Sequence, residues 1–163
     1  MLKTGFPPVV DADTRLLILG SLPGDASLAA GQYYGHPRNA FWRLVGAVIG
    51  RDLAALPYPE RLAALQTAGI GLWDVIVRAR RPGSLDQAIR EAEAADLPAL
   101  AGGLPRLKAV AFNGATAARI GRRSLAGLEG LALIDLPSSS PAHAARSFEA
   151  KARAWSALRP FVG

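Results

Sequence analysis

Two short segments of this sequence carry most of the side chains that are suited to hold a ligand. The first, residues 20–42, reads GSLPGDASLAAGQYYGHPRNAFW and combines glycines and prolines with two tyrosines, a histidine and an asparagine. The second, residues 136–144, reads LPSSSPAHA. A plain connecting loop needs no aromatic rings, so the first segment indicates a site for a flat ring.

Amide and ring side chains supply the candidate chemistry. The amides of Asn39 and Asn113 donate and accept together, so each fits the edge of a nucleobase or holds a water molecule. Each also has a structural interpretation, because Asn39 can cap a helix that begins at Ala40 and Asn113 can bond its own loop backbone. Phe41 is placed to stack on a flat ring whose edge Tyr34 lines, or else it belongs to the core of that helix.

The serine-rich segment favours a phosphate group. Hydroxyls and backbone N–H groups of residues 137–140, at the start of a helix, are expected to form a clamp for phosphate. Ordinary helix capping by Ser139 or Ser140 is the alternative. In the first segment, GSLPG allows close approach of the backbone, but it lacks the patterns of a P-loop or a dinucleotide-binding turn.

Apolar runs and turn residues predict the elements that position these loops. Buried strands are expected over residues 15–20, 70–77, 107–114 and 131–137, and helices over 40–50, 59–69, 84–104, 115–123 and 141–161. Strands that alternate with helices predict a parallel sheet covered on both faces. Ligands bind beyond the carboxyl ends of such strands, so the loops after the first, third and fourth strands should converge on one crevice.

Composition narrows the class of protein. The chain has 163 residues and no cysteine, which excludes disulfides, thiolate zinc sites, iron–sulfur clusters and cysteine nucleophiles. No apolar run reaches the length of a signal-peptide core or a membrane span. We therefore expect a single soluble domain over residues 1–163, located in the cytoplasm.

The charge balance points to a polyanion. The formal net charge is +6, and only Lys3, Lys108 and Lys151 are lysines, so arginine dominates the basic residues. The guanidinium fork suits phosphate, which favours a nucleic-acid partner. Arginine-rich codon usage in a GC-rich genome is the alternative source of the same excess.

The order and spacing of four motifs resemble the uracil-DNA glycosylase superfamily. GSLPG, HPRNAFW, AFNG and LPSSSPA follow one another across nearly the whole chain. Their combination most resembles the hypoxanthine-DNA glycosylase family, often called family six, with similarity to the mismatch-specific thymine/uracil branch. The resemblance implies a three-layer α/β/α sandwich around a four-stranded parallel sheet.

Three positions depart from the pattern of other members. Leu22 stands where many members place an Asp or Asn that acts on water, and the resemblance then implies Asn39 as the catalytic polar group. Gly24 replaces a tyrosine that walls off bulky bases, so the site is expected to admit a purine. Leu136 replaces a histidine that stabilises the uracil oxyanion. The residue that wedges into the duplex is not evident, and His143 and Arg146 are candidates.

The resemblance implies a monofunctional DNA glycosylase that removes a deaminated base, with hypoxanthine favoured and uracil possible. No lysine lies in a candidate loop, so an intact abasic site is the expected product. The expected substrate is double- or single-stranded DNA, bound by a monomer without a metal, an organic cofactor or a membrane. The expected base-binding residues are Phe41, Asn113, Ser21, Gly24 and Tyr34, and the DNA-backbone-binding residues are Pro137, Ser138, Ser139, Ser140 and His143.

Three other functions are compatible with the sequence. A uracil-first glycosylase is one. A catalytically weak member that only binds DNA is the second, because both the usual acid and the usual histidine are missing. A hydrolase of nucleotides or other small molecules in the same crevice is the third.

Overall fold

A sheet of four parallel strands forms the centre of the computed structural model, which describes residues 2–163. The strands are β2 (Leu16–Gly20), β3 (Ile70–Asp74), β6 (Ala109–Asn113) and β7 (Ala132–Leu136). They lie in the order β3-β2-β6-β7, and Leu16 pairs with Ile70 on one side and Ala109 on the other. Every residue of β2 and β6 is buried, as expected for a sheet with both faces covered. The predicted α/β class and parallel sheet are confirmed.

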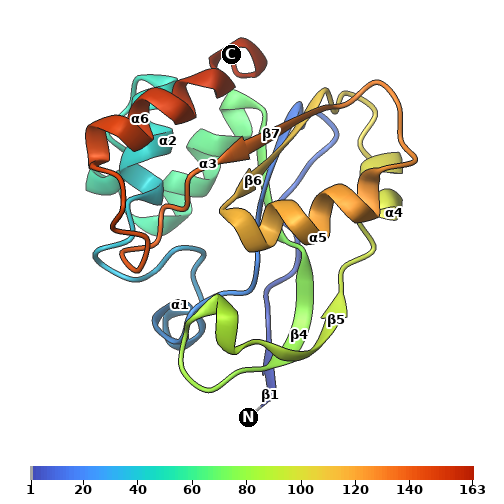
Figure 1. Cartoon of the computed structure of the whole chain (residues 1–163). Coiled ribbons are helices and arrows are strands. Elements are labelled where there is room, and N and C mark those ends of the chain that lie inside the picture. Colours follow the sequence, from blue (N-terminus) through green and yellow to red (C-terminus); the bar gives the residue numbers. More distant parts are fainter. Residues whose placement is uncertain (1) are drawn as a thin grey trace.

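Helices α2 (Phe41–Ile49), α3 (Tyr58–Ala68) and α6 (Phe148–Trp155) cover one face of this sheet, together with the short turns η1 (Leu53–Ala55) and η3 (Ser156–Phe161) (Figure 1). Alternate strand residues such as Leu16 and Ile18 pack with Leu44 and Trp155 in one hydrophobic cluster. In α2 the buried positions Phe41, Leu44, Val45 and Val48 follow the helical period, so this helix turns one continuous apolar stripe to the sheet.

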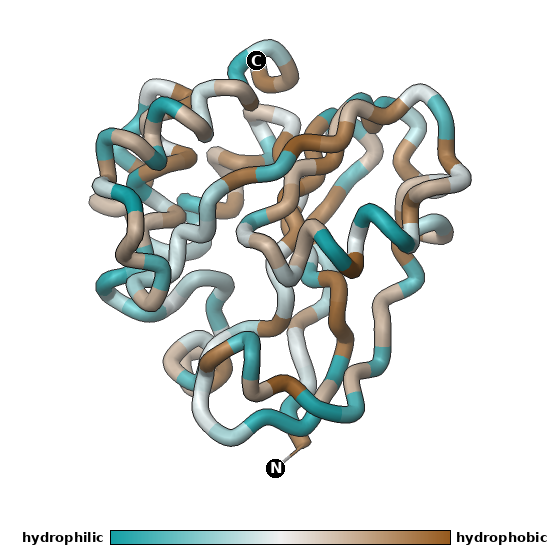
Figure 2. The backbone as a smooth tube through the Cα atoms, viewed as in Figure 1, coloured by the Kyte–Doolittle hydropathy of each residue, from teal (hydrophilic) through white to brown (hydrophobic). Residues whose placement is uncertain are grey.

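The opposite face packs against α5 (Ala115–Leu125), α4 (Leu97–Gly102) and a small antiparallel sheet. That sheet has the order β1-β4-β5, with strands β1 (Leu2–Thr4), β4 (Ile76–Arg80) and β5 (Arg90–Ala94). Leu17, Leu19, Val110 and Phe112 supply the cluster on this side. Figure 2 shows hydrophobic residues gathered along the central strands and hydrophilic residues along the outer loops. Within residues 2–163, no helix combines the length and apolarity needed to cross a membrane.

The strand expected over residues 70–77 is two strands in different sheets. β3 ends at Asp74, and the Val75 N–H still donates to the Gly20 carbonyl at 2.8 Å. The chain then leaves the parallel sheet, and β4 pairs with β1 and β5. This change of sheet places Asp74, and not a mid-strand residue, at the carboxyl edge of the parallel sheet.

The helix expected over residues 84–104 forms only in its last part, as α4. The segment forms a short turn, η2 (Asp86–Ala88), then β5, then α4. All five residues of β5 are exposed, and its side chains pair across to β4, with Arg80 Nε 2.7 Å from Glu91 and Arg78 Nε 3.1 Å from Glu93. Long-range pairing of charges thus overrides the helical propensity of an Ala- and Glu-rich segment.

The long helix expected over residues 141–161 begins later. Ser147 Oγ accepts a hydrogen bond from the Ala150 N–H and caps α6, which starts at Phe148. Residues 141–147 are therefore part of the loop after β7, and the serines do not lie at a helix N-terminus. A further helix, α1 (Asp25–Ala30), lies inside the loop after β2 and was not predicted.

Candidate functional site

The loops that follow the parallel strands meet at the carboxyl edge of the sheet. The Ala40 N–H, from the loop after β2, donates to the Ser139 carbonyl, in the loop after β7, at 3.0 Å. The Gly114 N–H, just after β6, donates to the Leu136 carbonyl at the end of β7 at 3.1 Å. The first of these bonds joins segments about a hundred residues apart in sequence, as expected for loops that follow different strands of one parallel sheet.

Asn113 ties two of these loops together. Its Nδ2 donates to Ser139 Oγ and its Oδ1 accepts from the Ser139 N–H, both at 2.9 Å. Asn113 and Ser139 are both buried. One N–H of the Asn113 amide is left after this two-point contact, so the side chain anchors the serine-rich loop and keeps one donor for a ligand.

Asn39 lies at the start of α2. Its Oδ1 accepts a hydrogen bond from the Phe41 N–H at 3.0 Å, which makes the side chain a helix cap. The side chain is half-buried, and the residue that follows, Ala40, contacts the serine-rich loop. The capping bond fixes the amide oxygen, so the Nδ2 group is the part left to act on a ligand or a water molecule.

The aromatic residues are arranged differently from the expectation. Phe41 has no exposed surface, and its ring packs edge-on against Trp155 with centroids 5.8 Å apart. The Tyr34 ring covers one face of Phe41, with centroids 3.8 Å apart and an interplanar angle of 9°. Direct stacking of a base on Phe41 is therefore corrected: Tyr34 is the half-buried ring, and Phe41 is the buried support beneath it.

Tyr34 is held in an unusual backbone conformation. Its φ angle is 54°, in the left-handed region that bulky residues seldom adopt. Its hydroxyl is buried and makes no hydrogen bond of standard geometry within residues 2–163, although the Asn113 amide lies beside it. Burial raises the pKa of this hydroxyl well above its ordinary value, and the nearby Asp74 carboxylate adds to the shift. Strain of this kind at one aromatic residue is a feature of ligand sites.

The serine-rich loop is anchored by three side chains, two from α6 and one from β6. Trp155 Nε1 donates to the Pro137 carbonyl at 3.0 Å, and Lys151 Nζ donates to the His143 carbonyl at 2.7 Å, in addition to the Asn113 contact. The side chain of Ser139 is fully enclosed by these contacts, so Ser139 is not available to a phosphate group.

Ser138 and Ser140 are the half-buried serines of this loop. Their hydroxyl oxygens accept from the backbone N–H groups of Ser140 and Ala142, at 3.1 and 3.2 Å. Each O–H group is then oriented by its own turn and remains a donor. Pro137 and His143 are also half-buried, so four of the five expected backbone-binding residues have accessible surface.

Lys151 contacts the site, although the sequence did not predict this contact. It lies in α6 with only 6% of its surface exposed, and burial lowers the pKa of its amine. Lys151 lies in a helix, as expected, but its hydrogen bond to the His143 carbonyl brings its amine into contact with a candidate loop.

A buried arginine supports the GSLPG loop from behind. Arg81 has no exposed surface and donates to the carbonyls of Leu22, Pro23 and Gly83. Ser21 Oγ donates to Asp86 Oδ1 at 2.6 Å. The conformation of this loop thus depends on residues that follow β4.

Gly24 is the residue before α1, and its carbonyl accepts from the Leu28 N–H at 3.0 Å. A Cβ atom at this position would lie 3.5 Å from Ser84 Oγ, which is an ordinary contact. Local packing therefore tolerates a side chain at Gly24, and its absence leaves extra room beside the loop.

Asp74 is the second residue that sequence reasoning missed. It ends β3, is 4% exposed, and its Oδ2 atom has no hydrogen-bond partner in the part of the chain that the structure describes. Burial, together with the nearby Asp86 carboxylate and against Arg81, raises the pKa of the carboxyl group to about 7. The rule that directed attention to strand ends would have found Asp74 if the end of β3 had been placed correctly.

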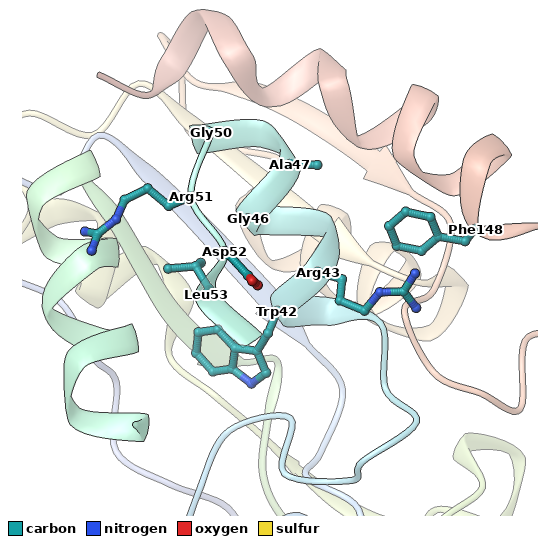
Figure 3. Close-up of a pocket in the computed structure, with 9 residues that line it drawn as sticks. All are labelled: Trp42, Arg43, Gly46, Ala47, Gly50, Arg51, Asp52, Leu53 and Phe148. Atoms are coloured by element: carbon teal, nitrogen blue, oxygen red, sulfur yellow. The ribbon is translucent and has the colours of Figure 1, made fainter. Parts of the chain in front are cut away.

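Two hollows lie outside this edge. Figure 3 shows the first, of about 430 Å³, on the outer side of α2. Arg43, Arg51 and Phe148 line it, and Arg43 stacks on the Phe148 ring at 4.0 Å. The second, of about 610 Å³, lies between η2, β5 and α5 and reaches Asp86. Neither hollow is lined by Asn39 or Tyr34.

The sequence that forms this edge matches the model of a known protein family. The model of the uracil DNA glycosylase superfamily matches residues 7–159, which includes every loop described above. The chain belongs to this superfamily. The resemblance seen in the motifs is thereby confirmed over nearly the full length.

Individual proteins similar to this chain carry more specific names than the superfamily. A hypoxanthine DNA glycosylase of Methanosarcina barkeri (strain Fusaro / DSM 804) is 52% identical over 114 residues, which cover 70% of this chain and 72% of the relative. A protein of the same name from Methanosarcina acetivorans is 47% identical over the same share. A solution NMR structure of a Methanosarcina acetivorans protein, described as a candidate uracil DNA glycosylase, superposes with a TM-score of 0.87 at 41% identity, covering 99% of each chain.

Proposed function

We propose that this member of the superfamily is a monofunctional DNA glycosylase that hydrolyses the N-glycosidic bond of a deaminated base in DNA, with hypoxanthine as the favoured base. The observation that carries the proposal is the Tyr34 ring, supported on buried Phe41, at an edge where the Asn39 amide and the serine-rich loop meet. The two Methanosarcina relatives named hypoxanthine DNA glycosylase support the choice of base.

The nucleotide has to leave the duplex before this site can act. A base inside the stack cannot be reached, so glycosylases turn the nucleotide out into their active site. The everted base lies on the free side of Tyr34, and Phe41 holds that ring in place from below. The backbone around Ser21 and Gly24 and the free N–H of Asn113 bind the edge of the base.

Bond cleavage then depends on orientation and charge. As the glycosidic bond breaks, the sugar gains oxocarbenium character and the leaving base gains negative charge, which preorganised donors stabilise. Asn39 Nδ2 positions the attacking water, because the Asn39 oxygen is already held by the Phe41 N–H. An amide is a poor proton acceptor, so Asn39 orients the water and does not remove its proton.

The serine-rich loop holds the DNA backbone. The O–H groups of Ser138 and Ser140 donate to phosphates that flank the everted nucleotide, while the Asn113–Ser139 contact keeps the loop in shape. Arg38 and Arg146 are exposed beside the two loops and add attraction for the phosphates. The protein acts on DNA as a monomer in the cytoplasm.

A base-release assay tests this proposal. Duplexes that carry a single hypoxanthine, uracil or xanthine are incubated with excess protein, and abasic sites are revealed by alkaline cleavage. The expected result is fastest release of hypoxanthine, with strands left intact until alkali is added. Binding of the hypoxanthine duplex without release of any base would instead indicate a binding protein.

Lysine chemistry is tested in the same reaction. Borohydride reduction traps any covalent adduct between an amine and the abasic sugar. We expect no trapped complex, because the Lys151 amine is committed to the His143 carbonyl. A trapped complex that disappears in Lys151→Met would replace the monofunctional mechanism with a lyase mechanism.

A uracil-first glycosylase is the second candidate. It is supported by the 41% identity to the Methanosarcina acetivorans protein described as a candidate uracil DNA glycosylase. The same panel separates the two candidates, because a uracil-first enzyme releases uracil faster than hypoxanthine from otherwise identical duplexes.

A further inference from the structure

Arg81 is a fully buried cation that lies behind the GSLPG loop. It follows β4 directly and has no exposed surface. Its guanidinium donates to three main-chain carbonyls, those of Pro23 at 2.7 Å, Gly83 at 2.8 Å and Leu22 at 3.4 Å. All three acceptors are neutral, and burial of a charge among neutral groups is costly. The charge of Arg81 therefore needs an explanation beyond its hydrogen bonds.

Three carboxylates lie near this cation. Burial lowers the pKa of Arg81, and Asp25, Asp86 and Asp74 act against that shift. Asp25 Oδ1 is 4.0 Å from Arg81 Nη2 and also pairs with Lys3 at 2.6 Å. Asp74 and Asp86 form no ion pair within residues 2–163. Arg81 is thus the cation that balances the acidic groups on this side of the edge.

Arg81 also orients the peptide between Pro23 and Gly24. A trans peptide directs its N–H opposite to its carbonyl, and no peptide bond within residues 2–163 is cis. Because the Pro23 carbonyl accepts from the guanidinium, the Gly24 N–H points away from it. A hydrogen-bonded charge polarises the peptide that it contacts, so the buried guanidinium strengthens the positive end of this dipole.

The same loop lines the part of the edge where the proposed reaction places the departing base. Negative charge grows on that base as the glycosidic bond breaks. Carboxylates without a counter-charge nearby would raise the barrier, because like charges repel. Leu136, where the resemblance implies a charge-stabilising histidine in other members, is buried and apolar and supplies no donor. Groups on other elements must therefore offset the charge of the base.

We propose that Arg81 is a positioning residue for bond cleavage, which balances the three carboxylates around it and orients the Pro23–Gly24 peptide, so that negative charge can grow on the departing base. Arg81 is enclosed and does not touch the base, so it acts through the loop in front of it. The proposal rests on the proposed glycosylase function, and it holds for whichever base the enzyme releases.

The dependence of the rate on the leaving base tests this role. Two pairs of single-lesion duplexes are compared, hypoxanthine with 8-azahypoxanthine and uracil with 5-fluorouracil, under single-turnover conditions at about pH 8, where Asp74 is ionised. In each pair the second base carries an electron-withdrawing change, so it leaves more easily and needs less stabilisation from the protein. In Arg81→Met, release of the first base should fall about a hundredfold and release of the second about tenfold or less. A purely structural defect lowers both rates by the same factor.

Two further variants separate charge from packing. Arg81→Lys keeps a cation at this position, so the two rates of each pair should stay near the wild-type ratio. Asp25→Asn leaves the guanidinium in place and removes a carboxylate whose side chain is 56% exposed. In this variant, release of the poorer leaving base should rise about two- to fivefold relative to the better one at low ionic strength.

Asp135→Asn is the matched control, because Asp135 is also an exposed carboxylate that pairs with an arginine, Arg122 at 2.9 Å, and lies outside the site. Its ratio of rates should equal that of wild type. Equal losses for both bases of a pair in Arg81→Met overturn the proposal. If Arg81→Met does not fold, an Asp25→Asn ratio equal to that of Asp135→Asn overturns it. If wild-type protein releases none of the four bases, it is the proposed function that fails, and Arg81 then has no such role.

Discussion

The rings of Tyr34 and Phe41 lie almost parallel, with centroids 3.8 Å apart, and only Tyr34 has accessible surface. Phe41 is enclosed by α2 and by Trp155 of α6, so it cannot move away from this contact without disrupting the core. The pair therefore divides two tasks between two residues. Under the proposed function, Tyr34 presents a ring face to the base, and Phe41 supports that ring from the core.

Removal of the Tyr34 ring should impair the reaction more than the fold. Stacking of a base on an aromatic side chain contributes about 1–3 kcal/mol, so Tyr34→Ala should lower kcat/KM for hypoxanthine release by about 5- to 150-fold. Tyr34→Phe keeps the ring and should stay within a few-fold of wild type. Single-turnover rates of the two variants make the comparison, and equal rates for Tyr34→Ala and wild type would remove Tyr34 from the site.

Truncation of the Phe41 side chain should lower the free energy of unfolding. Phe41→Ala leaves a cavity beneath Tyr34, and large-to-small changes of this kind cost about 3–5 kcal/mol of the free energy of unfolding. Phe41→Leu should retain most of that stability and measurable turnover. Urea titrations give the stabilities. A Phe41→Ala protein that unfolds at the wild-type urea concentration but binds damaged DNA poorly would return the stacking role to Phe41.

The two functions of Asn39 can be separated. Asn39→Ala removes both the helix cap and the amide, so we expect a loss of about 0.5–2 kcal/mol in stability together with most of the turnover. Asn39→Ser keeps a capping oxygen for the α2 backbone but lacks the Nδ2 donor. It should melt near the wild-type temperature and still turn over slowly. A fully active Asn39→Ser protein would show that only the cap matters.

The contact between Asn113 and Ser139 should behave as one unit. Either Asn113→Ala or Ser139→Ala leaves buried polar groups of the partner unsatisfied, at about 1–3 kcal/mol. Because the second substitution removes the group that the first left unpaired, the double variant should be less destabilised than the sum, with a coupling of about 0.5–3 kcal/mol. A double-mutant cycle by urea unfolding measures this coupling, and strict additivity would contradict the hydrogen bond between the Asn113 amide and the Ser139 hydroxyl.

Stability should depend on the protonation of Asp74. Its carboxyl pKa is about 7 in the folded protein and near 3.8 when unfolded, so between these values the folded state binds the extra proton. The free energy of unfolding should therefore fall as the pH rises from about 4 to 7, by on the order of 2 to 4 kcal/mol from this group.

Asp74→Asn should remove that part of the pH dependence and be more stable than wild type at about pH 8, because no buried charge remains. Urea titrations of both proteins across the pH range provide the measurement. Parallel pH profiles for the two proteins would mean that Asp74 is not the titrating group.

The parallel sheet was predictable because local signals coincide with tertiary ones. Each of its strands is a short apolar run that ends near a Gly, Pro, Asp or Asn, and burial on both faces removes any alternation. The predictions of secondary structure fail where an apolar or helix-favouring run continues past the point at which the chain changes its pairing partner. Residues 75–77 are as apolar as β3, so nothing local marks the point at which the chain enters the second sheet. The pairing of β5 with β4 depends on charges at least ten residues away.

The site was predictable to the extent that strand ends define it. Asn39 and the serine-rich loop follow from that rule, whereas the enclosure of Phe41 depends on how Tyr34 folds back with φ 54°. Lys151 could not be foreseen, because its contact with His143 exists only once α6 begins at Phe148 and residues 141–147 form a loop.

The three anchors of the serine-rich loop have a mechanical consequence. Asn113, Trp155 and Lys151 each bind a different point of this loop. The loop is therefore rigid and does not open and close over the site. Under the proposed function, the DNA duplex therefore has to bend to fit this loop. Lesions with the weakest base pairing then deform most easily, so the stiffness of the duplex contributes to the choice of lesion.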